Sequence, residues 1–61
     1  METEPQVDEW VGTAIDLLKN SIIALENAIS MTTDINLKNT LQFECENIRM
    51  LNESLQAYIL P

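Results

Sequence analysis

The sequence predicts an all-α protein: a two-helix antiparallel hairpin with helices at about residues 5–31 and 34–60. Three observations predict it. In each half of the chain, apolar residues recur alternately three and four positions apart, as they do on the buried side of a helix. The repeats of the two halves are out of phase, which indicates two helices rather than one. Glycine occurs once and proline only at Pro5 and Pro61, so long stretches contain no strong helix breaker.

The first helix is expected to begin at Pro5, because a proline fits the first turn, where its missing N–H leaves no hydrogen bond unmade. Thr3 is the expected N-cap, with residues 1–4 frayed. The apolar ladder of this helix should form the core of the hairpin or bundle. Its members are Val11, Ile15, Leu18, Ile22, Leu25 and Ile29.

Residues 31–34 interrupt the apolar pattern and are expected to form the turn. Thr33 or Asp34 is the expected N-cap of the second helix, because short polar side chains accept hydrogen bonds from free backbone N–H groups there. The second ladder also passes through Glu44 and Tyr58. Its core members are Leu37, Leu41, Ile48, Leu51 and Leu55.

An alternative is one long coiled-coil helix that continues through the junction. The junction holds neither glycine nor proline, and apolar spacing of four residues on both sides of Thr33 is typical of a stutter in a coiled coil. Both arrangements bury an apolar seam against another helix.

A chain of 61 residues has a marginal core, and small domains are usually reinforced by disulfides, metals or oligomerisation. A single cysteine, Cys45, excludes an internal disulfide, and the chain has no histidine for a zinc site. Further apolar residues lie outside both ladders. We therefore expect the hairpin to complete a helical bundle by oligomerisation, through a partner interface formed by Trp10, Leu17, Met31, Phe43 and Met50.

Glu44 is the one charged residue within an apolar ladder. In a buried seam, a carboxylate must pair with a base, reach solvent or become neutral. The alternatives are a position that faces water, and a residue that sets the register or meets a basic group on a partner.

Ten acidic residues against three basic ones give a net charge of −7. This charge repels phosphate backbones, so direct nucleic-acid binding is not expected. No stretch reaches the ~18 apolar residues that span a bilayer, and the acidic N-terminus does not resemble a signal peptide. We expect a soluble intracellular protein, of cytoplasm or nucleus.

No catalytic residues, cofactor site or metal site are expected. The chain has no histidine, no glycine-rich phosphate loop and no nucleophile with a base in a recognisable motif. An enzyme that acts on a small-molecule substrate is therefore not expected.

Two functions remain. The first is a non-enzymatic protein–protein interaction subunit that assembles with itself or with other helical chains in a larger complex. The alternative is a small acidic regulator or inhibitor, for instance a viral one, that binds and blocks one target protein. The apolar columns carry the first hypothesis and the acidic side chains carry the second.

Overall fold

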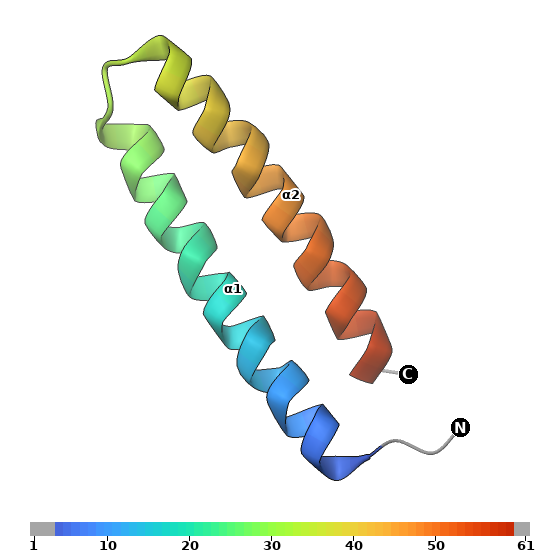
Figure 1. The fold of residues 1–61 in the computed structure, drawn as a ribbon. Coiled ribbons are helices and arrows are strands. Elements are labelled where there is room, and N and C mark those ends of the chain that lie inside the picture. Colours follow the sequence, from blue (N-terminus) through green and yellow to red (C-terminus); the bar gives the residue numbers. More distant parts are fainter. Residues whose placement is uncertain (1–3, 60–61) are drawn as a thin grey trace.

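The computed structural model describes residues 4–59, which form two helices, α1 (Pro5–Met31) and α2 (Ile35–Ile59). The helices run antiparallel and lie side by side, so the first turn of α1 and the last turn of α2 lie toward the same end of a rod of 48 × 14 × 13 Å (Figure 1). The first turns of α1 extend beyond the end of α2 (Figure 1). The predicted all-α hairpin is confirmed. The alternative of one continuous helix is wrong, because residues 32–34 are not helical.

Polar side chains in the turn explain why the helix does not continue. The hydroxyl oxygen of Thr32 accepts a hydrogen bond from the backbone N–H of Asp34 at 3.1 Å. The Asp34 carboxylate accepts hydrogen bonds from the N–H groups of Asn36 at 3.0 Å and Leu37 at 3.2 Å. These contacts offer the backbone an alternative to helical hydrogen bonds. Asp34 is thus the N-cap of α2, one of the two caps that the sequence predicted.

The start of α1 uses a different cap from the expected one. Glu4 occupies the N-cap position with an extended backbone, and no side chain caps the helix there. Its carbonyl oxygen accepts a hydrogen bond from the N–H of Asp8 at 3.0 Å, with Pro5 in the first turn. The expected cap, Thr3, lies outside the described residues.

The side of α1 that packs on α2 follows the predicted ladder. Ile15 is buried, with 7% of its surface exposed, and the other five ladder residues are half-buried. The pattern continues through Thr32, which is also half-buried. The spacing of alternately four and three residues therefore describes the contact side of α1 over its length.

The contact side of α2 differs from the predicted ladder. Cys45 and Asn52 are buried, at 3% and 7% exposure, whereas Glu44 and Leu51 are exposed. The half-buried residues that accompany the buried pair are Leu41, Ile48, Leu55 and Ile59, with Gln56 beside them. At every second position of the predicted ladder, the buried residue is thus the next one along the chain. Cys45 takes the place of Glu44, and Asn52 that of Leu51. This arrangement keeps the Glu44 charge in water and places small side chains between the helices, which favours close packing.

Candidate protein-interaction surface

Most large apolar side chains of the hairpin are exposed. Only Ile15, Cys45 and Asn52 are buried within residues 4–59. The exposed large apolar residues are Val7, Trp10, Leu17, Ile23, Met31, Ile35, Leu37, Phe43, Met50, Leu51 and Tyr58. Single exposed apolar residues are ordinary, whereas contiguous exposed apolar patches are typical of interaction sites.

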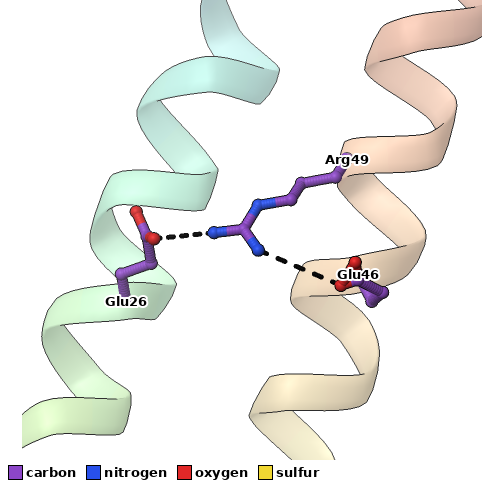
Figure 2. Close-up of polar contacts among 3 residues, drawn as sticks. All are labelled: Glu26, Glu46 and Arg49. Carbon is purple, nitrogen blue, oxygen red and sulfur yellow. Dashed lines mark hydrogen bonds and ion pairs between the residues drawn. The ribbon is translucent and has the colours of Figure 1, made fainter.

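One flank of the hairpin is polar. Arg49 of α2 donates a hydrogen bond from Nη2 to Oε2 of Glu26 in α1 at 2.6 Å, and its Nη1 lies 3.9 Å from Oε2 of Glu46 (Figure 2). Both partners of the short pair are about half exposed. Because Glu26 directly follows Leu25 and Arg49 directly follows Ile48, residues that follow these seam positions share one flank.

Other residues one heptad away extend this polar flank. Lys19 precedes Glu26 by seven residues, and Gln42 and Gln56 flank Arg49 at the same distance. A hollow of about 480 Å³ lies on this flank beside the ion pairs. Its lining residues are Glu26, Ile29, Ser30, Gln42, Cys45, Glu46 and Arg49. The flank therefore carries charge and amide groups along the ion pairs. It also holds two exposed apolar side chains, those of Ile23, three residues before Glu26, and Ile35, seven residues before Gln42.

The opposite flank is apolar. A helix turns about 100° per residue, so residues that precede a seam position rotate away from Glu26 and Arg49. On α1 these are the small residues Ala14, Ser21 and Ala28. The adjacent column of α1, further from α2, contains Trp10, Leu17 and Met31. On α2 they are Leu37, Glu44, Leu51 and Tyr58. We call this set of residues the apolar flank.

Large side chains of the apolar flank are open to solvent. Leu17 is 61% exposed on α1 and Leu51 is 50% exposed on α2. Trp10, in the second turn of α1, is 75% exposed. Both helices thus contribute to one side of the molecule, which matches the shape that a neighbouring helix pair packs against.

Phe43 and Met50 form a second surface. They lie seven residues apart on the side of α2 turned away from α1, and are 66% and 61% exposed. We call this pair the outer column. The predicted partner interface is therefore divided, with Trp10, Leu17 and Met31 on the apolar flank and these two residues on the outer column.

The remaining predicted site residues have definite places. Leu37 and Leu51, expected in the core, are 47% and 50% exposed on the apolar flank. Glu44 is exposed between them and forms no ion pair with Lys19 in the described part of the chain. Its role in register or partner binding stays a prediction.

Sequence reasoning missed Asn52 in the contact side of α2. Its side-chain Oδ1 is buried and has no hydrogen-bond partner. A buried amide oxygen without a hydrogen-bond partner lowers the free energy of unfolding, so Asn52 is expected to destabilise the contact between the two helices. Asn52 lies seven residues after Cys45, but the predicted ladder used the preceding residues, Glu44 and Leu51, at these two positions.

Within residues 4–59, no three His, Cys, Asp or Glu residues are placed to hold a metal ion. Neither described helix has the length and apolar character needed to cross a membrane. Compared with protein-family models, curated proteins and solved structures, the chain matches none of them.

Proposed function

We propose that this protein is a non-enzymatic interaction subunit, a small helical hairpin that assembles with itself or with other helical chains. The observation that carries the proposal is that, within residues 4–59, eleven large apolar side chains are exposed beside a core of three buried residues. Burial of apolar surface favours association, so covering these side chains would stabilise a complex. One buried free thiol, Cys45, fits a reducing intracellular setting.

A second candidate is the acidic regulator that blocks one target protein. The net charge of −7 favours it, and acids such as Glu46 and Glu53 lie away from the apolar flank. Binding through these acids would weaken steeply as salt is added, because exposed charges are screened. Binding through apolar surface would change little over the same range of salt.

Purification of the tagged protein from the cells that make it separates the two candidates. The chains compared are the wild type, Leu51→Glu, the double variant Phe43→Glu/Met50→Glu, and the charge control Glu46→Gln/Glu53→Gln. The interaction-subunit proposal predicts that at least one apolar variant loses its partner about tenfold or more, while the charge control keeps it. Partner loss in the charge control alone supports the acidic regulator. Equal recovery from all four chains overturns the proposal.

A further inference from the structure

We propose that a second copy of this chain covers the apolar flank and forms a four-helix dimer. This inference rests on the proposed function and names the partner and the surface that it uses. The apolar flank contains one charged residue, Glu44, among its large and small apolar positions. It therefore offers no pattern of acids for a basic partner, while the charges of each copy lie mainly elsewhere.

The exposed area fits one partner of similar size. The chain exposes 5000 Å², whereas a folded monomer of this mass is expected to expose about 4,000 Å². The excess of about 1,000 Å² reflects the rod shape of the single hairpin, and an interface of standard size, which covers about 800 Å² of each protein, would remove most of it. A second hairpin laid along the rod has the length to cover such an area.

On the apolar flank, the side chains nearest the seam are small on α1 and mostly large on α2. Ala14, Ser21 and Ala28 leave shallow places along α1, seven residues apart. On α2, a column with the same spacing holds Leu51 and Tyr58. Large side chains of one helix pack best against small ones of its neighbour, which also lets the helices approach closely.

The register set by Glu26 and Arg49 places these columns at matching heights. Given that contact, Ser21 lies within about one turn of the level of Leu51, and Ala14 of the level of Tyr58. A two-fold axis parallel to the helices then lays α1 of each copy over α2 of the other. All neighbouring helices in the resulting bundle are antiparallel, and Ser21 of one copy meets Leu51 of the other.

Glu44 and the outer column take different places in this dimer. Glu44 lies in the same column as Leu51, at the level of Ala28, so its carboxylate enters the edge of the interface and weakens it. Phe43 and Met50 point away from α1 and stay outside the interface. Substitutions at the neighbouring positions 43 and 44 are therefore expected to differ: a change at Glu44 alters the strength of the dimer, and a change at Phe43 does not.

Sedimentation equilibrium of the purified full chain tests this arrangement, with helix content measured by circular dichroism on the same samples. The wild type is expected at twice the chain mass of 6.9 kDa. Leu51→Glu should raise the dimer dissociation constant about tenfold or more. Glu44→Leu should lower it, and Phe43→Glu should leave it unchanged. Leu51 is half exposed in the single hairpin, so its replacement leaves the helices formed.

A helical wild type that sediments as a monomer, or with a stoichiometry other than two, overturns the inference. Loss of the dimer in Phe43→Glu and not in Leu51→Glu overturns the choice of surface. A monomer that still recovers another protein from cells, in a manner sensitive to the apolar variants, leaves the proposed function intact. If the wild type is a monomer and the apolar variants recover the same proteins from cells as the wild type does, both the dimer and the proposed function are overturned.

Discussion

Arg49 and Glu26, which lie on different helices, are joined by a hydrogen-bonded ion pair of 2.6 Å on the polar flank of the hairpin (Figure 2). The pair marks the polar flank of each helix and shows which parts of the two helices lie at similar heights. The position of the apolar flank follows from it, because that flank lies on the other side of the same seam.

Loss of this ion pair is expected to change stability little. Glu26→Gln should lower the free energy of unfolding by less than about 1 kcal/mol, because both side chains are about half exposed and water screens the attraction. Urea unfolding at one fixed chain concentration measures the change. Glu53→Gln, on the same side of α2 without an ion pair in the described structure, is the control. A loss of several kcal/mol would show that the pair holds the hairpin together.

Asn52 is expected to weaken the hairpin in which it is buried. Asn52→Leu should raise the free energy of unfolding by about 1 kcal/mol or more, because it removes a buried oxygen without a partner and adds apolar contact. Thermal unfolding followed by circular dichroism detects the shift. A less stable Asn52→Leu protein would mean that the amide makes a hydrogen bond in the assembled state, and Asn52→Asp would then be expected to be worse still.

The N-cap Asp34 is expected to stabilise the hairpin. Asp34→Ala should lower the free energy of unfolding by about 1 kcal/mol, because it removes the acceptor of two backbone hydrogen bonds. Thr33→Ala is the matched control, because Thr33 occupies the same turn and makes no side-chain hydrogen bond in the described structure. Urea unfolding of the two variants should therefore separate them. Equal destabilisation by both would show that the turn depends on its overall shape and not on the cap.

Gly12 is expected to limit the stability of α1. Gly12→Ala should raise the free energy of unfolding by up to about 1 kcal/mol, because a Cβ added there meets no atom within 4 Å and alanine favours the helix. Helix content by circular dichroism and the unfolding midpoint both report the change. An unfavourable effect would place another chain against this position, since the single hairpin has room for the methyl group.

The contact side of α1 was predictable from sequence, and that of α2 was not. Along α1, the predicted ladder is more apolar than the residue columns on either side of it, so the sequence indicates one contact side. Along α2, Leu41, Ile48 and Leu55 belong equally to two stripes, one through Leu51 and one through Asn52. Hydrophobicity favours the stripe through Leu51. The structure uses the other, since the choice depends on how α1 packs.

The division of the predicted partner interface also required the structure. The sequence shows that Leu17 and Phe43 lie outside the ladders, but the angle between them across two helices depends on the rotation of α2. The contact between Glu26 and Arg49 shows how α2 is rotated relative to α1. Helix boundaries, by contrast, followed from local signals such as Pro5 and Asp34, which act within one turn.

The central claim is that other protein covers the apolar surface of this chain in the cell. The most direct test is the native mass of the protein in an extract of the cells that make it, at its natural level, by size-exclusion chromatography with light scattering. The wild type is predicted to run in an assembly of at least twice 6.9 kDa, and Leu17→Glu/Leu51→Glu to run as a smaller species. A wild-type chain that runs as a folded monomer of 6.9 kDa would contradict the claim.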